Sequence, residues 1–501
     1  MGHGAFYPAR AKICNRRALC ANWVGIAAAA AAKDSVMDPI VVATATETRP
    51  LALVTADGLK AWMAAQDDAT RAWLSGSGFE GKEGDLALLP DGLAGAGIGA
   101  IFVHADDGSS EDFWRLASLP VRLPLGIWRI DSQLSAAGAT RAAIAWGVGG
   151  YQFTRYRKAA RAAARLLMPA GADTTAVERC VEADGFVRDL INTPAQDMGP
   201  AELAAAAVAM AEELGMRARV ITGADLLAEG HRLIHAVGRA SSRPPRLIDL
   251  SWGDPAHPAV TLVGKGVCFD TGGLDLKGAD GMKLMKKDMG GAAHVLGLAR
   301  MVVRAGLKLR LRVLVAAVEN AVSGNAFRPM DIVTSRKGKT VEIGNTDAEG
   351  RLILADALDL ASEDKPALIV DMATLTGAAR VALGPDLPAA FCNHEGVAAA
   401  LARHAAAEAD PAWRLPLWKP YRAMLDSKAA DINNVGSGPM AGSITAALFM
   451  QEFVGAGIPW LHFDIYGWNA AAKPGRAEGA QAQVLRALFA MLAERAQSQT
   501  F

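Results

Sequence analysis

The chain has 501 residues, of which 51% are hydrophobic and 21% charged, and its 52 basic residues balance its 52 acidic ones. This composition is that of an ordinary globular protein, and the length suggests two or three domains rather than a single core. The balanced charge argues against a protein that is drawn to nucleic acid or to an anionic membrane, and no apolar run is long enough to span a bilayer.

Residues 1–36 differ from the rest of the chain. They contain five basic residues and an alanine run, and their first acidic residue is Asp34. They read either as a weak signal or transit peptide or as a disordered upstream segment, with Met37 as the functional start. We favour the second interpretation because the alanine run is only marginally apolar. Two of the five cysteines lie in this segment, and none has zinc-motif spacing, which favours a reducing, cytoplasmic environment.

Residues 37–170 alternate short apolar runs with helical stretches, as in a small α/β domain. We predict strands at 40–43 and 98–103, and helices at 58–66 and 156–167. The sequence Met-Pro-Ala-Gly that ends at Gly171 breaks this pattern. We therefore expect an N-terminal α/β domain over residues 37–170 and a catalytic domain over residues 171–501.

The second half of the chain alternates helices and strands more regularly. The predicted helices are 174–190, 201–214, 290–304 and 352–362, and the predicted strands are 246–252, 259–263, 310–318, 367–374 and 460–466. This order indicates an α/β fold with a mixed, largely parallel sheet flanked by helices. Because sites in such sheets form at the carboxyl ends of strands, the loops after Val263, Val318 and Ala373 should carry the chemistry.

The octet at residues 345–352, Asn-Thr-Asp-Ala-Glu-Gly-Arg-Leu, is the most informative stretch of the chain. In an extended segment the side chains of Asp347 and Glu349 point the same way and could share one divalent cation. Gly350 would let the backbone turn sharply, and Arg351 would add a planar cation suited to a small anion.

Two other segments, 263–277 and 285–291, carry reactive side chains and glycines that permit close approach of the backbone. With the octet they supply four carboxylates, two lysines and one arginine: Asp270, Asp288, Asp347, Glu349, Lys265, Lys277 and Arg351. Converging carboxylates repel one another, and two divalent cations would relieve this repulsion and activate water as a nucleophile. No His or Cys is needed, so Mn²⁺ or Mg²⁺ would suit the site as well as Zn²⁺.

Other readings of these motifs compete with a metal site. Gly264 and Gly266 after a strand could begin a dinucleotide-binding fingerprint in an oxidoreductase, but Phe269 stands where the third glycine belongs. His231 and His235 have metal-ligand spacing without the glutamate of a zinc protease motif, which favours a structural role. An apolar neighbourhood favours packing over nucleophilic catalysis for the cysteine at 268.

At these motifs the chain resembles the leucyl aminopeptidase family, the cytosol aminopeptidases of the M17 metallopeptidases. The resemblance rests on the octet, on Val-Gly-Lys-Gly and Phe-Asp-Thr-Gly-Gly within 263–273, and on Lys-Lys-Asp-Met-Gly-Gly-Ala-Ala at 286–293. Further similarity occurs at 318–320, 323–326, 374–378 and 442–447. It extends from about residue 180 to the end of the chain, whereas the N-terminal domain is similar only in size and position.

The resemblance implies a role for each polar residue of the site. Asp270 and Glu349 would bridge two metal ions, Lys265 and Asp288 would complete the tighter metal site, and Asp347 would complete the more exchangeable one. Lys277 would stabilise the oxyanion, and Arg351 would hold a bicarbonate that acts as general base. The implied pocket for the first substrate side chain is lined by Met285, Thr374, Leu375, Gly377 and Tyr466. The family usually has alanine in place of this tyrosine, which leaves a preference for leucine open.

The resemblance also implies a function. The chain would be a hydrolase, a cytoplasmic, homohexameric metalloprotease of the aminopeptidase class that removes N-terminal residues from peptides. Its cofactors would be two zinc or manganese ions, with magnesium also compatible, that hold a bridging water or hydroxide. The alternative is a non-catalytic member of the same fold that serves as a DNA-binding protein or scaffold, which the neutral charge and the intact motifs disfavour.

Overall fold

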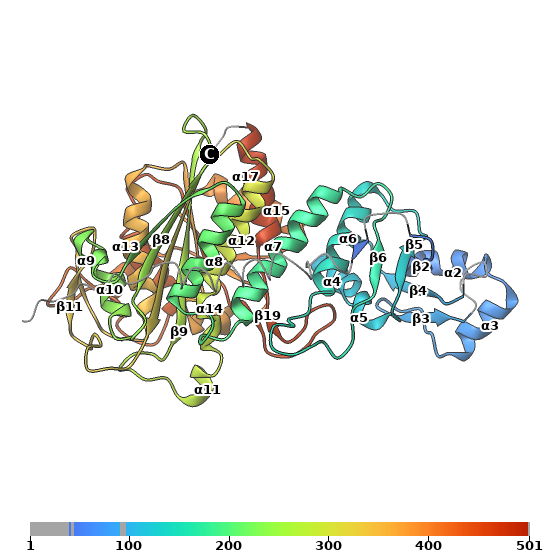
Figure 1. Cartoon of the computed structure of the whole chain (residues 1–501), viewed down its shortest axis with the longest axis horizontal. Helices are drawn as coiled ribbons and strands as arrows, with labels where there is room; N and C mark the ends of the chain where they lie inside the picture. Colours follow the sequence, from blue (N-terminus) through green and yellow to red (C-terminus); the bar gives the residue numbers. More distant parts are fainter. Residues whose placement is uncertain (1–39, 42–44, 91–96, 499–501) are drawn as a thin grey trace, which may run out of the picture. The chain divides into compact units, whose positions relative to one another are not determined.

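The computed structural model describes residues 40–41, 45–90 and 97–498, and two main sheets organise them (Figure 1). The smaller sheet has the strand order β1-β6-β5-β2-β4-β3, and its strands are parallel except for β3, which runs antiparallel to β4. Its strands are β1 (Ile40–Val41), β2 (Arg49–Thr55), β3 (Leu86–Leu89), β4 (Gly99–His104), β5 (Ile127–Ile130) and β6 (Arg165–Leu167). The helices of this part are α2 (Ala56–Ala64), α3 (Asp68–Gly76), α4 (Ser110–Ala117), α5 (Leu119–Arg122) and α6 (Ala136–Gly149).

The larger sheet has the order β15-β14-β17-β13-β9-β10-β8-β7. Its central strands β17, β13, β9 and β10 are parallel, whereas β7, β8 and β14 pair antiparallel with their inner neighbours. The strands are β7 (Arg217–Thr222), β8 (Arg246–Trp252), β9 (Ala259–Asp270), β10 (Arg310–Asn320), β13 (Leu368–Ala373), β14 (Ala389–Cys392), β15 (Trp413–Arg414) and β17 (Trp460–Asp464). The predicted fold class, a mixed and largely parallel sheet, is confirmed.

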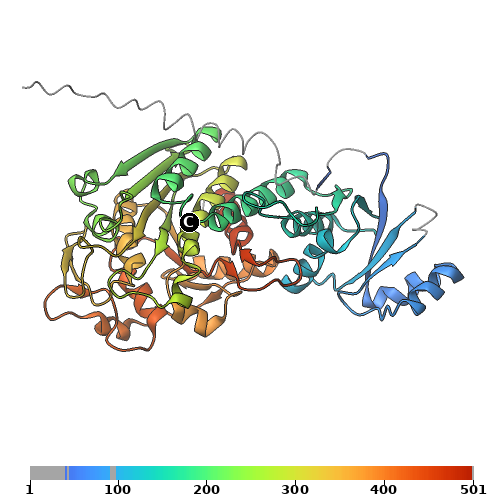
Figure 2. The same ribbon diagram turned by 60° about the horizontal axis from the view of Figure 1, so that its bottom comes forward.

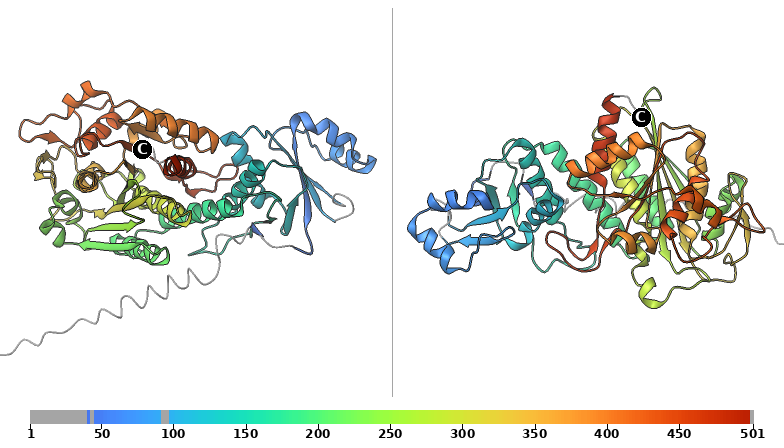
Figure 3. Two further views of the ribbon diagram at one scale, coloured as in Figure 1. Left: turned by 90° about the horizontal axis from the view of Figure 1, so that it is seen from above. Right: turned by 180° about the vertical axis from the view of Figure 1, so that it is seen from behind.

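Helices cover both faces of this larger sheet (Figures 2 and 3). The helices on one face are α7 (Thr174–Asn192), α8 (Pro200–Glu213), α12 (Gly290–Arg304), α15 (Glu395–Ala407) and α17 (Leu485–Ser498). Those on the other face are α10 (Arg232–Gly238), α13 (Glu349–Glu363) and α16 (Gly442–Gln451). Successive residues of β10 show why: Val313 and Val315 pack into the first core, and Leu314 and Ala316 into the second. A strand buried on both faces needs this continuous apolar sequence.

Short elements connect these layers. They are α9 (Asp225–Ala228), α11 (Ala279–Met282), the 3₁₀ helices η1 (Met285–Met289) and η2 (Lys419–Leu425), and α14 (Gly377–Leu383). Two small sheets, β11 (Ile332–Thr334) with β12 (Thr340–Glu342) and β16 (Ile432–Asn433), and β18 (Trp468–Asn469) with β19 (Gly479–Ala480), complete the fold. Within the described residues, no helix has both the length and the apolar character that a membrane crossing requires.

The predicted helix at 156–167 is wrong. This segment is irregular until β6 begins at Arg165, and most of its side chains are exposed. Arg161 donates a hydrogen bond to the carbonyl of Val121 at 2.9 Å, and the hydroxyl of Tyr156 donates to Asp197. The segment lacks an apolar stripe of helical period, so these contacts with distant residues decide its path. The predicted strand at 40–43 is described only at Ile40–Val41, and residues 42–43 lie outside the described part of the chain.

Candidate active site

The polar residues singled out in the sequence gather at the carboxyl ends of β9, β10 and β13. Asp270 is the last residue of β9, Asn320 is the last of β10, and Thr374 follows the end of β13. One detail of the prediction was wrong, because β9 does not end at Val263 but continues to Asp270. Lys265 therefore projects from inside a strand rather than from a loop.

A β-bulge accounts for the meeting of Lys265 and Asp270. Five positions separate them, so in a regular strand their side chains would point to opposite faces. The pairing of β9 with β10 shifts by one residue, because Val318 lies opposite Val267 but Glu319 lies opposite Phe269. The extra residue between them reverses the alternation and turns both reactive side chains toward the same side.

Asp347 and Glu349 also converge, although not for the predicted reason. Asp347 lies in a turn rather than an extended segment, and Glu349 is the first residue of α13. Carboxylate oxygens of Asp270, Asp347 and Glu349 lie within 4.8 Å of one another. Gly350 is helical, not a sharp turn, and a Cβ there would stand 2.6 Å from Cε of Lys265. A larger residue at this position would have to displace the lysine stem, which passes against the glycine.

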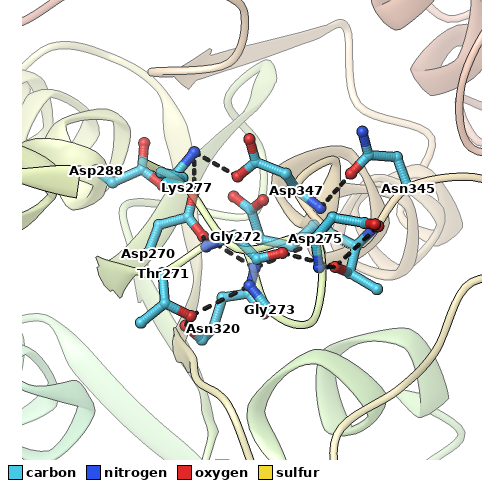
Figure 4. Close-up of polar contacts among 12 residues, drawn as sticks. Asp270, Thr271, Gly272, Gly273, Asp275, Lys277, Asp288, Asn320, Asn345 and Asp347 are labelled. Atoms are coloured by element: carbon cyan, nitrogen blue, oxygen red, sulfur yellow. Dashed lines mark hydrogen bonds and ion pairs between the residues drawn. The ribbon is translucent and has the colours of Figure 1, made fainter. Parts of the chain in front are cut away.

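Each of the two lysines sits between two carboxylates. The ammonium of Lys265 is 2.9 Å from both Asp288 and Glu349 and donates to the carbonyl of Thr374 at 2.8 Å. The ammonium of Lys277 is 2.9 Å from Asp270 and donates to the side chain of Asp347. Figure 4 shows Lys277 between these two carboxylates, with Asp288 beside them.

We call the cluster of Lys265, Asp270, Lys277, Asp288, Asp347 and Glu349 the cage. Burial and neighbouring charges act together on the pKa values of its side chains. Burial and the neighbouring Asp270 raise the pKa of Glu349 to about 8, although Lys265 opposes them. The same two causes raise the pKa of Asp347 to about 6. Burial alone would lower the pKa of Lys265, but Asp288 and Glu349 outweigh it and raise that pKa. A raised pKa means that the ionised carboxylate is unfavourable in this environment. A divalent cation bound nearby would stabilise the ionised form.

Within the described part of the chain, two oxygens of the cage are held only by the ammonium of Lys265. Asp288 Oδ2 and Glu349 Oε1 are buried and accept no hydrogen bond from any described residue, although each lies within ion-pair distance of Lys265. Buried carboxylate oxygens without hydrogen bonds are costly, and oxygen-rich sites suit divalent cations. The side chains present therefore fit divalent metal ions.

Arg351 lies beside the cage on α13. Its side chain is buried and donates to the carbonyl of Asn434 at 2.7 Å, while its Nε has no partner among the described residues. Burial lowers the pKa of Arg351 to about 10. A buried guanidinium with a free N–H retains the capacity to bind a small anion.

The five predicted pocket residues lie on three segments near the cage. Met285 opens η1, Thr374 to Gly377 lead from β13 into α14, and Tyr466 follows β17. Thr374 is tied to the cage itself, because its hydroxyl donates to Asp288 at 2.7 Å. The carboxylate of Asp464 accepts hydrogen bonds from the backbone N–H of Leu375 and Thr376. The end of β17 therefore fixes the loop that borders the cage.

Several supporting residues carried no predicted role. Asn320 donates to Asp270 at 2.9 Å and to the carbonyl of Thr346 at 3.1 Å. The side chain of Asn434 accepts from Gly344 and Asn345 and so anchors the start of the octet. Asn320 stands within a motif of the resemblance and could have been found there. Asn434 stands outside every motif of the resemblance, so its role followed only from the fold.

Three residues of the alternative readings, His231, Cys268 and Gly264, have structural explanations. His231 is buried at the start of α10, and burial lowers its pKa to about 4, as suits a neutral core histidine. Cys268 is buried, and its thiol contacts the carbonyl of Gly266 at 3.6 Å. Gly264 accommodates helix α12, because a Cβ there would stand 2.7 Å from Cα of Ala292. This glycine serves packing between strand and helix.

Known proteins resemble the chain along most of its length. A model of the cytosol aminopeptidase catalytic domain matches residues 185–489, and one of the M17 aminopeptidase N-terminal domain matches residues 49–169. A probable cytosol aminopeptidase of Caulobacter vibrioides is 36% identical over 446 residues, which cover 84% of this chain and 90% of that protein. A cytosol aminopeptidase structure from Coxiella burnetii aligns with a TM-score of 0.87 and 47% identity, over 91% of this chain and 99% of that one.

A third similar protein widens the range of the comparison. The bottromycin maturation enzyme BotP, solved in complex with Mn, aligns with a TM-score of 0.80 and 32% identity, over 90% of this chain and all of that chain (100%). The chain belongs to the cytosol aminopeptidase family, as its motifs predicted. It is accordingly a hydrolase of the metallo-aminopeptidase class.

Proposed function

We propose that this chain removes N-terminal residues from peptides at the cage formed by Lys265, Asp270, Lys277, Asp288, Asp347 and Glu349. The observation that carries the proposal is the convergence of the carboxylate oxygens of Asp270, Asp347 and Glu349 within 4.8 Å of one another, with Asp270 and Glu349 buried. Two divalent cations, zinc or manganese with magnesium also compatible, would lower the pKa of water and polarise the scissile carbonyl. BotP in complex with Mn supports a divalent cation in this fold.

The residues of the chain divide into two groups around the site. Lys265 and Asp288 form the deeper group, and Asp347 and Lys277 form the group nearer to solvent, because Asp347 is the most exposed carboxylate of the site. For Lys265 to act as a ligand, its ammonium must lose a proton, which cations bound nearby would favour. Asp270 and Glu349 stand between the two groups and would bridge them.

Lys277 and Arg351 would act on the substrate and on the proton. Lys277 reaches the outer carboxylates from a separate loop, so its ammonium could donate a hydrogen bond to the oxyanion of the tetrahedral intermediate. The free Nε of Arg351 would hold a bicarbonate, which would take a proton from the attacking water. Neither role requires the backbone segment that carries the side chain to move.

The remaining assignments of the proposal follow the family. We place the boundary between the N-terminal and catalytic domains near residue 170. The match to the N-terminal family model ends at residue 169, and the match to the catalytic model begins at residue 185, which supports this boundary. The name cytosol aminopeptidase, carried by the relatives, supports a cytoplasmic location. The assembly would be a homohexamer, and the partners would be peptides rather than nucleic acid or membrane.

The test is hydrolysis of aminoacyl-p-nitroanilides by protein that was treated with chelator and then supplied with Mn²⁺ or Zn²⁺. We expect Asp270→Ala and Glu349→Ala to abolish turnover while circular dichroism shows an intact fold. Asp254→Ala is the matched control, because this exposed acid precedes β9 at the opposite end of the strand. Full activity in either cage variant, or activity independent of added metal, would refute the proposal.

A further inference from the structure

Two cationic side chains stand near the ring of Tyr466. The ammonium of Lys287 stands 4.7 Å from the ring centroid, and the guanidinium carbon of Arg380 stands 5.0 Å from it. Tyr466 occupies a predicted pocket position, so these charges belong to the wall that the first substrate side chain would face. An apolar pocket for leucine would contain neither charge.

The ammonium of Lys287 has no hydrogen-bond acceptor among the described residues. Its residue is only 5% exposed, and no described residue accepts a hydrogen bond from it or forms an ion pair with it. The charges that act on it are Asp288, Lys265, Arg380 and Asp464. Asp288 is held by Lys265 and Thr374, and Asp464 accepts from the backbone of the loop after β13. The N–H groups of this ammonium therefore have no acceptor from the described residues, and a ligand could supply one.

Arg380 brings the second cation over the same pocket. It lies on α14, and its Nη2 is 3.8 Å from the position that a Cβ of Gly377 would occupy. The guanidinium therefore reaches back across Gly377, another predicted pocket position. Among the described residues no carboxylate pairs with Arg380, and none accepts a hydrogen bond from the Tyr466 hydroxyl. The wall thus presents unpaired donors from three different segments: η1, α14 and the end of β17.

We infer that this pocket selects peptides whose first residue is acidic, with Lys287 and Arg380 binding the side-chain carboxylate beside Tyr466. The guanidinium of Arg380 offers a carboxylate two parallel N–H donors, and the ammonium of Lys287 adds a third donor. The substrate carboxylate would accept hydrogen bonds from both cations without displacing any existing hydrogen bond. This inference rests on the proposed function, because the pocket is defined by the residue whose peptide bond the cage hydrolyses.

The decisive comparison is between N-terminal glutamate and N-terminal glutamine, which have the same shape. We expect the metal-loaded enzyme to show a kcat/KM about 10- to 100-fold higher for glutamyl- than for glutaminyl-p-nitroanilide, from charge-assisted hydrogen bonds. Arg380→Met should remove most of this ratio, chiefly through a higher KM for the glutamyl substrate. Arg380 is exposed, so this variant should fold; Lys287→Met should act in the same direction.

Lys308→Met is the matched control, because Lys308 is an exposed lysine just before β10, at the end of the strand away from the cage. It should leave the ratio unchanged. Equal rates for glutamyl and glutaminyl substrates, or a glutamyl preference that survives Arg380→Met and Lys287→Met, would overturn the inference while leaving the proposed function intact. No hydrolysis of any aminoacyl substrate with any added metal would instead overturn the proposed function.

Discussion

The substitution Glu349→Gln should make the metal-free protein more stable, although it should destroy the metal site. The side chain keeps its shape and loses its charge. Glu349 is buried, and its carboxylate stands beside Asp270 in the cage. Burial and that neighbour raise the pKa of Glu349 to about 8 from its ordinary value of 4.5. A carboxyl group of this kind stabilises the fold only while it is protonated, so its contribution falls as the pH rises from 4.5 toward 8.

The size of the effect follows from the same shift. At pH 7 a rise of the pKa from 4.5 to about 8 costs the folded state about 3 kcal/mol relative to the unfolded chain. The amide of glutamine does not ionise and avoids this cost. Lys265 keeps its contact with Asp288 at 2.9 Å, so the substitution does not leave that ammonium without a partner.

The assay is unfolding by urea in the presence of chelator at several pH values. We expect the midpoint of Glu349→Gln to exceed that of the wild type at pH 7 and the two to converge near pH 4.5. With Mn²⁺ added the order should reverse, because cations that bind only the folded state stabilise it by mass action. Glu363→Gln, an exposed acid at the other end of α13, is the control and should change stability by less than about 1 kcal/mol. A metal-free Glu349→Gln protein that is less stable than the wild type at pH 7 would refute the reasoning.

Further predictions concern the lysine, a core histidine and a glycine of the site. Lys277→Ala should lower kcat by about 100-fold or more while metal analysis still finds bound cations; loss of metal together with activity would contradict this. Burial lowers the pKa of His294 from 6.5 to about 4, and its neutral Nε2 accepts a hydrogen bond from the backbone N–H of Gln483. Because the unfolded chain binds this proton more readily, about 3 kcal/mol of stability should be lost as the pH falls from 6.5 to 4. Urea unfolding of His294→Gln in chelator should lack this acid loss, and an unchanged pH dependence would disprove it. Gly350→Ala should displace the stem of Lys265 and weaken metal binding about tenfold or more in a metal titration, whereas an unchanged affinity would show that the stem can yield.

Much of the fold was predictable because its elements have strong periodicity. The bounds of β8 and α12 match the predicted residues, and the mixed, largely parallel sheet follows from the alternation of helices and strands. The set of polar residues was predictable for a different reason. The carboxylates stand in motifs that each follow a strand or open a helix, and the topology of an α/β sheet brings such points to one edge.

What the sequence could not predict depends on contacts between distant residues. The bulge opposite Glu319 has no local signature, yet it decides that Lys265 and Asp270 face the same side. The reading of Asp347 and Glu349 as neighbours on an extended segment was wrong in geometry, although the two side chains do meet through a turn and the first residue of α13. The segment 156–167 contains alanines that favour a helix, whereas Arg161 donates to the carbonyls of the distant Val121 and Leu123.

The two lysines of the cage explain how so many buried acids can fold together before any cation binds. Each ammonium lies between a pair of carboxylates and offsets part of their mutual repulsion, Lys265 in the deeper group and Lys277 in the outer one. An arginine could make the same ion pairs, but it cannot lose its proton and would remain as a competitor for the cations. Lysine can give up its charge when a stronger one arrives. The residue type at position 265 is therefore set by two requirements at once, a folded metal-free state and a site that cations can still enter.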